Sequence, residues 1–127
     1  MKIRLMSIFK KNKQKKEAPP IQSWESIVDA LYDEGLDAFC NEVIRVIYSK
    51  DRSMRYVILK DEKNLLTYEL EAIYQFDNDE WQYLCSHRAI PAMWEPYRGV
   101  LGSSVFARVE DLLRELMAEP EYKKFFE

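Results

Sequence analysis

The chain has 127 residues, of which 47% are hydrophobic, and a formal net charge of −3. A chain of this length can bury roughly two-thirds of its unfolded surface, so we expect an ordered core rather than a disordered polypeptide. Its apolar runs are only a few residues long, far below the ~20 needed to cross a bilayer, so no transmembrane helix is expected. Residues 21–127 are predicted to form a single α+β domain.

The modest net charge hides a strong asymmetry along the chain. Residues 1–16 carry seven Lys or Arg and no acid, whereas residues 17–127 carry 12 basic and 22 acidic side chains, a charge of −10. An acidic body repels phosphate backbones and favours basic partners. We therefore expect no nucleic-acid binding by the body of the protein.

Residues 1–20 are predicted to be a basic flexible tail and linker, because a run of like charges repels itself and Pro19-Pro20 disfavours helix. The segment Met1 to Lys16 also contains apolar residues, so it could make weak contact with an anionic membrane. The alternatives are a solubilising tail or a start of translation at Met6. The segment lacks the features of a secretory signal, and two cysteines fit a reduced protein, so a cytoplasmic location is predicted.

The first helix is predicted over Ser23 to Glu34. Ser23 is a good N-cap residue, and Gly35 follows where a left-handed residue often closes a helix. The apolar residues recur at helical spacing: Trp24, Ile27, Val28, Leu31 and Tyr32.

A closing helix is predicted over Ser104 to Glu119, capped by Ser103 or Ser104. Pro120 then begins a short final turn, whose aromatic residues Tyr122, Phe125 and Phe126 are expected to dock the terminus on the core. One stripe of the helix is apolar: Phe106, Val109, Leu112, Leu113, Leu116 and Met117.

Between these helices, Met54 to Ser86 predicts consecutive antiparallel strands. Side chains alternate between apolar and polar from Leu66 to Phe76, which indicates a strand with one buried face. Met54 to Lys60 is apolar on both faces, as suits an interior strand. Asp61 to Asn64 supplies a hairpin turn, and a second turn at Asp77 to Asp79 leads to a last strand, Glu80 to Ser86.

Two segments are harder to assign. Leu36 to Tyr48 matches a helical face, yet its β-branched residues favour a strand from Glu42 to Tyr48 that pairs with Met54 to Lys60. His87 to Gly102 contains two prolines and two glycines, which predicts an irregular loop. Its apolar residues indicate that this loop packs on the sheet.

The expected fold class is α+β, with an antiparallel meander sheet of three to four strands flanked by an N-terminal and a C-terminal helix. One face of the sheet is expected to pack under helices. The layout is similar to that of small bacterial immunity-type and regulatory domains, a likeness of arrangement that says little about function.

His87 is the single histidine, so a histidine-based catalytic site would depend on it alone. Cys85 lies two residues away and would share a face with it on the strand expected at Glu80 to Ser86. A structural role is favoured, because Cys85 continues an apolar face with Trp81 and Tyr83. We therefore expect no enzymatic activity.

Metal and cofactor sites are not expected either. The acidic run Asp77 to Glu80 lacks the glycine and distal glutamate of a calcium loop, and one histidine with two separated cysteines cannot close a zinc site. Glu69 and Glu71 lie on the same face of the predicted strand, about 7 Å apart. Two carboxylates at this separation can serve as the catalytic pair in glycoside hydrolysis. Their polar neighbours favour a solvated face instead. The isolated glycines form no phosphate-binding loop.

The function expected from these features is that of a non-catalytic interaction module whose acidic sheet face and Trp94 loop bind a basic protein, as an immunity protein blocks a basic nuclease toxin. The alternatives are a peripheral membrane adaptor held by Met1 to Lys16 and a small enzyme with a site near His87. The tryptophans belong either to the core or to the interface. The candidate partner-binding residues are Glu69, Glu71, Asp77, Asp79, Glu80, Trp81, Arg88, Trp94, Tyr97 and Arg98.

Overall fold

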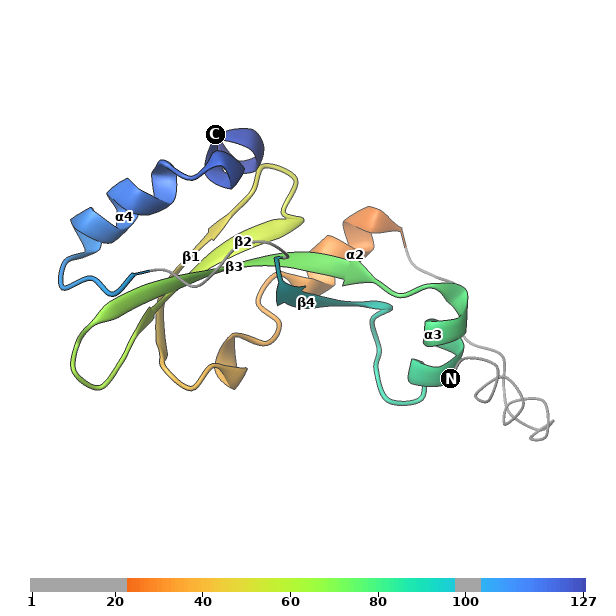
Figure 1. Cartoon of the computed structure of the whole chain (residues 1–127). Coiled ribbons are helices and arrows are strands. Elements are labelled where there is room, and N and C mark those ends of the chain that lie inside the picture. Colours follow the sequence, from red (N-terminus) through yellow and green to blue (C-terminus); the bar gives the residue numbers. More distant parts are fainter. Residues whose placement is uncertain (1–22, 98–103) are drawn as a thin grey trace. The chain divides into compact units, whose positions relative to one another are not determined.

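The computed structural model describes residues 23–97 and 104–127, which form a four-stranded antiparallel sheet and helices, an α+β fold (Figure 1). The expectations for the tail at residues 1–20 and for Arg98 lie outside the described residues. The sheet order is β1-β2-β3-β4, which confirms the meander. In chain order the elements are α2 (Trp24–Leu31), η1 (Leu36–Ala38), β1 (Glu42–Tyr48), β2 (Met54–Lys60), β3 (Leu66–Gln75), α3 (Asn78–Leu84), β4 (Ala92–Pro96), α4 (Val109–Met117) and η2 (Tyr122–Phe126).

The described residues group into two compact units. We call them the α3 unit, which comprises α2 and Tyr74–Met93, and the sheet unit, which comprises Tyr32–Ile73 and the described residues from Trp94 to Glu127.

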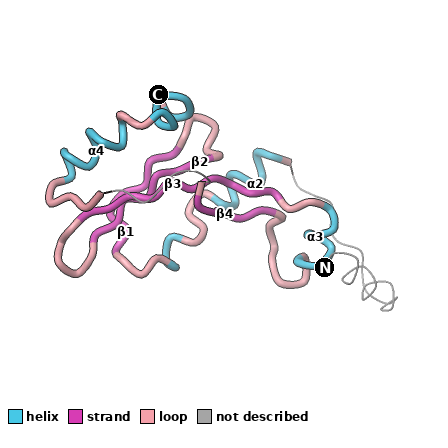
Figure 2. The backbone as a smooth tube through the Cα atoms, in the orientation of Figure 1, coloured by secondary structure: helices cyan, strands magenta, loops and turns pink. Residues whose placement is uncertain are grey.

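In the sheet unit, β1, β2 and β3 follow one another as hairpins (Figure 2). The strands predicted at Glu42–Tyr48 and Met54–Lys60 are confirmed, and they pair from Glu42↔Lys60 to Tyr48↔Arg55 with a register shift between Val43 and Arg45. The strand assignment of the ambiguous segment is therefore correct, because a string of β-branched residues fits the pleated surface better than a helix.

The core of the sheet unit lies between one face of β2 and β3 and the helix α4 (Figure 1). Six of the seven β2 residues are buried, as expected for an interior strand. The aromatic residues after Pro120 pack against this core, which confirms that the terminus docks there. The buried core residues are Met54, Tyr56, Ile58, Leu66, Tyr68, Leu70, Leu112 and Leu116.

The closing helix is shorter than the predicted Ser104 to Glu119. Phe106 forms an isolated antiparallel bridge with Leu66, with N···O distances of 2.7 and 2.8 Å in the two directions. Because this backbone is extended along β3, the helix begins only after Arg108.

The strand predicted at Glu80 to Ser86 is wrong, because this segment contains most of the helix α3. Asp77 caps it: the Asp77 side chain accepts a hydrogen bond from Glu80 N at 2.8 Å, and the Glu80 side chain accepts one from Asp77 N at 2.9 Å. This reciprocal capping box satisfies two backbone donors at the start of the helix. Cys85 is the C-cap of α3, so the predicted strand face that it would share with His87 does not exist.

The irregular loop predicted over His87 to Gly102 contains a strand, β4, in its described part. Backbone bonds flank it on both sides, from Phe76 N to Pro91 O at 3.0 Å and from Tyr97 N to Leu70 O at 2.9 Å. Pro91 and Pro96 lie at the margins of this edge strand, where a missing N–H interrupts no central ladder.

The first helix is also shorter than predicted, since α2 ends at Leu31 rather than Glu34. Ser23 caps it as expected, with Ser26 N donating to Ser23 Oγ at 3.3 Å. Gly35 is left-handed, with φ of 80°, but it follows a turn and precedes η1 rather than closing α2. Among residues 23–97 and 104–127, no helix has the length and apolar character needed to cross a membrane.

Candidate functional site

The most strongly constrained charge in the sheet unit is Arg55 on β2, whose side chain is 1% exposed. Its Nε donates to Glu71 Oε1 at 2.8 Å, and its Nη2 donates to the backbone oxygen of Glu34 at 2.9 Å. Nη1 donates to the backbone oxygen of Tyr32 at 3.4 Å. The guanidinium carbon lies 4.1 Å from the centre of the Trp94 ring, a cation–π contact.

This arrangement accounts for two of the candidate partner-binding residues. Arg55 and Glu71 are direct partners in the β2–β3 register, so the sheet itself brings the two charges together. The Glu71 side chain is 13% exposed and Trp94 is 9% exposed. Both side chains therefore serve the interior of the sheet unit, and Glu71 is not the solvated carboxylate that its polar neighbours suggested.

Glu69 differs from Glu71. It is exposed on β3, as expected of a polar strand face. Partial burial, followed by the negative charge of Glu71, raises the pKa of Glu69. Because Glu71 is ion-paired with Arg55, the two carboxylates do not form the isolated pair that hydrolysis of a glycoside would use.

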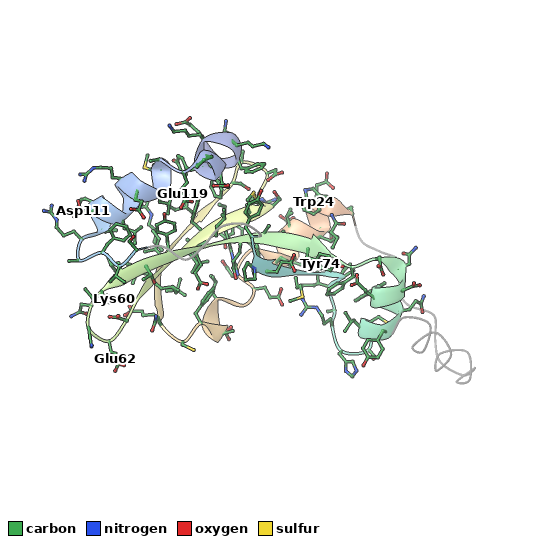
Figure 3. The ribbon with its side chains drawn as sticks, in the orientation of Figure 1. Trp24, Lys60, Glu62, Tyr74, Asp111 and Glu119 are labelled. Atoms are coloured by element: carbon green, nitrogen blue, oxygen red, sulfur yellow. The ribbon has the colours of Figure 1, made fainter. Side chains whose placement is uncertain are left out.

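On the other face of the sheet, two phenols hold one carboxylate. Tyr56 donates to Glu119 Oε1 at 2.7 Å and Tyr68 donates to Glu119 Oε2 at 2.6 Å. Glu119 follows α4 and lies between that helix and the sheet (Figure 3). Burial, followed by the hydrogen bond to Glu119, raises the pKa of both tyrosines above its ordinary value. The trio fastens the end of α4 to the sheet with neutral donors.

The α3 unit holds the remaining acidic candidates. Asp77 and Glu80 form the capping box, and the Tyr74 hydroxyl lies 2.7 and 2.8 Å from the two carboxylate oxygens of Glu80. Asp79 is exposed in the first turn of α3. Trp81 is 4% exposed, so it belongs to the core of this unit.

The basic and aromatic candidates have structural contacts. Arg88 donates to the backbone oxygen of Ala92 at 2.7 Å, and its guanidinium lies 5.7 Å from the centre of the Phe76 ring. Tyr97, in the sheet unit, is half-buried and packs against the core. These side chains therefore stabilise their own units.

The sequence did not reveal which apolar side chains stay on the surface. In the α3 unit, Tyr74, Tyr83 and Met93 are all exposed, and Tyr83 is 44% exposed. The sequence pattern predicts that Tyr83 shares a strand face with Trp81. On a helix, however, the side chains of residues two positions apart point in different directions. Asp77 and Glu80 are three residues apart, the spacing of a capping box, and this signal in the sequence indicates a helix in place of the predicted strand.

Outside these clusters, the described His, Cys, Asp and Glu side chains form no compact group. The described residues contain no group of three His, Cys, Asp or Glu side chains that could hold a metal ion. An open polar hollow lies where β1 begins and β2 ends, and Lys60 Nζ is 3.8 Å from Glu42 Oε1 there. Its lining residues are Cys40, Asn41, Glu42, Lys60, Asp61 and Glu62. Lys60 and Glu62 lie near the β2–β3 turn (Figure 3).

Comparison with known proteins adds no relative: no protein-family model, no curated protein and no solved structure matches this chain.

Proposed function

We propose that this protein is a non-catalytic binding module that recognises a basic protein through its α3 unit. The observation that carries the proposal is the charge of that unit. Its described residues contain five carboxylates and one cationic side chain, a net charge of −4. The carboxylates are Glu25, Asp29, Asp77, Asp79 and Glu80, and the cation is Arg88.

The positions of these charges favour recognition of a partner. Glu25, Asp29 and Asp79 are exposed, whereas the Arg88 guanidinium is directed at backbone oxygens. A surface of one sign accelerates encounter with an oppositely charged protein, and salt screens the attraction. The proposal moves the expected interface from the Trp94 region to α3, because Trp94 and Glu71 are buried partners of Arg55.

An immunity-like role, in which the module blocks a basic nuclease toxin, is one concrete form of this function. Cys40 and Cys85 are free thiols, which fits the cytoplasmic location that we propose with it. The membrane-adaptor alternative depends on Met1 to Lys16, which lie outside the described residues. For an enzyme near His87, the described residues supply no observation in its favour.

The test is affinity capture from the source cell's lysate with two matched variants. Glu25→Gln with Asp79→Asn removes two exposed carboxylates of the α3 unit, and Asp37→Asn with Glu62→Gln removes two exposed carboxylates of the sheet unit. If each carboxylate contributes about 0.5 kcal/mol, the first variant should retain about fivefold less of a basic partner than the natural chain. The second should retain the same amount.

Moderate salt should release the same partner from the natural chain. Equal capture by both variants, or recovery of a partner without a basic surface, would contradict the proposal.

A further inference from the structure

The surface of α3 is apolar as well as acidic. Asp79 and Tyr83 are both exposed and lie four residues apart on α3, so they are neighbours on one side of the helix. The Tyr74 hydroxyl is hydrogen-bonded to the carboxylate of Glu80 beside them, and Tyr74 is 36% exposed. We call these four residues, Tyr74, Asp79, Glu80 and Tyr83, the α3 face.

A ligand that matches this face must combine cationic with apolar side chains. The N-terminal segment of the chain itself combines both kinds of side chain. The first 16 residues carry seven Lys or Arg and no acid. The positive charge of that segment complements the −4 of the described α3 unit. Its apolar residues, Ile3, Leu5, Met6, Ile8 and Phe9, precede the basic run Lys10 to Lys16.

The order of the chain tethers the basic segment to the unit that contains α3. The basic segment precedes α2, and α2 belongs to the same compact unit as α3. The six residues between Lys16 and Ser23 can span at most about 20 Å. This maximum reach is about twice the length of α3, which is about 10 Å. A short tether of this kind gives an effective concentration on the order of 1 mM.

We propose that Met1 to Lys16 binds the α3 face of its own chain and competes there with the basic partner. The inference rests on the proposed function for the identity of the surface and adds its regulation. A partner then gains the surface by displacing the segment, which favours partners with more positive charge than the segment itself. Binding by the segment is intramolecular, so dilution of the protein does not relieve it.

The test uses the full chain and a peptide with the sequence of residues 1–16, labelled for fluorescence anisotropy. A tail variant carries Lys10, Lys11, Lys13, Lys15 and Lys16 each changed to Gln. If the peptide binds this variant with a Kd of ~100 µM, the natural chain should bind it about tenfold more weakly, because its own segment is present at about 1 mM. A peptide with the same five substitutions should bind neither protein.

The site is mapped in the tail variant. Asp79→Asn with Tyr83→Ser should weaken peptide binding at least fivefold. Asp37→Asn with Met117→Ser, which changes an exposed acid and an exposed apolar residue of the sheet unit, should leave it unchanged. Equal affinity of the peptide for the natural chain and the tail variant would overturn the inference.

Other results separate this inference from the proposed function. If capture of a basic partner depends on the α3 carboxylates while the peptide binds neither protein, the inference fails and the proposed function stands. If both measurements are insensitive to the α3 variants, both fail. If the natural chain binds phosphatidylserine vesicles, the tail variant does not, and the α3 variant has no effect, the segment is assigned to a membrane and the inference is overturned.

Discussion

Arg55 is a charged side chain in the interior of the sheet, and its neighbours explain why it is tolerated there. A buried cation is costly unless it is paired and its donors are used. Glu71 supplies the charge, the Tyr32 and Glu34 carbonyls accept hydrogen bonds, and Trp94 supplies a ring face. The arginine thereby connects β2 and β3 to the Tyr32–Glu34 turn and to β4.

Replacing Arg55 with Met should lower the free energy of unfolding by about 3–5 kcal/mol, because it leaves Glu71 and two carbonyls without this partner. Urea denaturation measures the change. Adding Glu71→Met should recover part of the loss, since no unpaired carboxylate then remains. Arg45→Met, at an exposed position of β1, is the control and should change stability by less than about 0.5 kcal/mol. A small effect of Arg55→Met alone would contradict this account.

Tyr56 and Tyr68 predict a loss of stability at high pH. Their folded-state pKa values lie above the usual value of about 10, because burial and Glu119 disfavour the charged phenolates. The raised pKa values therefore contribute to the free energy of unfolding, and this contribution is complete below about pH 10. It is lost as the pH rises above that value, by at most about 1.4 kcal/mol per pH unit for each tyrosine.

Tyr56→Phe should therefore reduce the slope of unfolding free energy against pH above pH ~10, with a cost of about 1 kcal/mol at neutral pH for the lost hydrogen bond. Tyr83→Phe, at an exposed position, should reproduce the slope of the natural chain. If the slope of unfolding free energy against pH is unchanged in Tyr56→Phe, the Tyr56 phenol has the same pKa in the folded and unfolded states, which contradicts this prediction.

The pairing of Arg55 with Glu71 was only partly predictable. The alternation of Leu66 to Phe76 put Glu71 on the face opposite the core. It could not show that a second layer, the Tyr32–Glu34 turn with Trp94, covers this face as well. That cover depends on backbone carbonyls, whose positions follow from tertiary structure and not from side-chain pattern.

Among the elements, the helix α3 is stabilised more by its capping box than by its length. It has seven residues, and isolated helices so short are not stable in water. Asp77→Ala should cost about 1 kcal/mol and speed hydrogen exchange of the α3 amides. Asp77→Asn should retain most of the cap, and Asp79→Ala removes a carboxylate outside the box as a control. Equal exchange in Asp77→Ala and Asp79→Ala would argue against the cap.

The contrast between predicted and observed elements has a physical cause. The strands β1, β2 and β3 carry period-two or β-branched patterns, which agree with their local preference, and they were predicted within one residue. At α3 and its C-cap, the apolar residues Trp81, Tyr83 and Cys85 recur at every second position, as they would in a strand, but the two hydrogen bonds of the capping box favour a helix. The β4 strand follows Pro91 and ends at Pro96, and it pairs with β3, which is distant in the sequence.

The apolar stripe of α4 gives a further test. Leu116 is fully buried and Met117, the next residue, is exposed. Leu116→Ala should lower the free energy of unfolding by about 2–5 kcal/mol, because it leaves a cavity against β2 and β3. Met117→Ala should cost less than about 0.5 kcal/mol, and similar losses for the two would show that α4 does not cover the sheet with this stripe.

For the molecule as a whole the net charge is −3, but in its described residues charge repulsion is a destabilising factor. The described residues carry 21 acidic and 11 basic side chains, a net charge of −10. The exposed ion pairs, such as Arg108 with Glu110 and Arg114 with Asp111, contribute little. Self-repulsion at this charge destabilises the compact state, and salt screens it.

The Tm of the tail variant, in which five lysines of residues 1–16 no longer offset this charge, should therefore rise by roughly 2–4 °C when NaCl is increased from about 0.02 M to about 0.2 M, a change that shortens the Debye length from ~20 Å to ~7 Å. Differential scanning calorimetry measures the shift. Adding Glu25→Gln with Asp79→Asn to the tail variant should give a smaller rise, since that protein begins with less repulsion. A Tm that is constant or falls with salt would contradict this picture.

The position of Glu119 also bears on how the protein is made. Ribosomal synthesis releases all four strands before α4 and η2, so the Tyr56 and Tyr68 side chains emerge well ahead of the carboxylate and helix that cover them. Until then the apolar side chains that face α4 in the folded protein have no cover, and exposed apolar surface of this kind is where chaperones act. The core of the sheet unit can therefore close only after α4 and η2 have been synthesised.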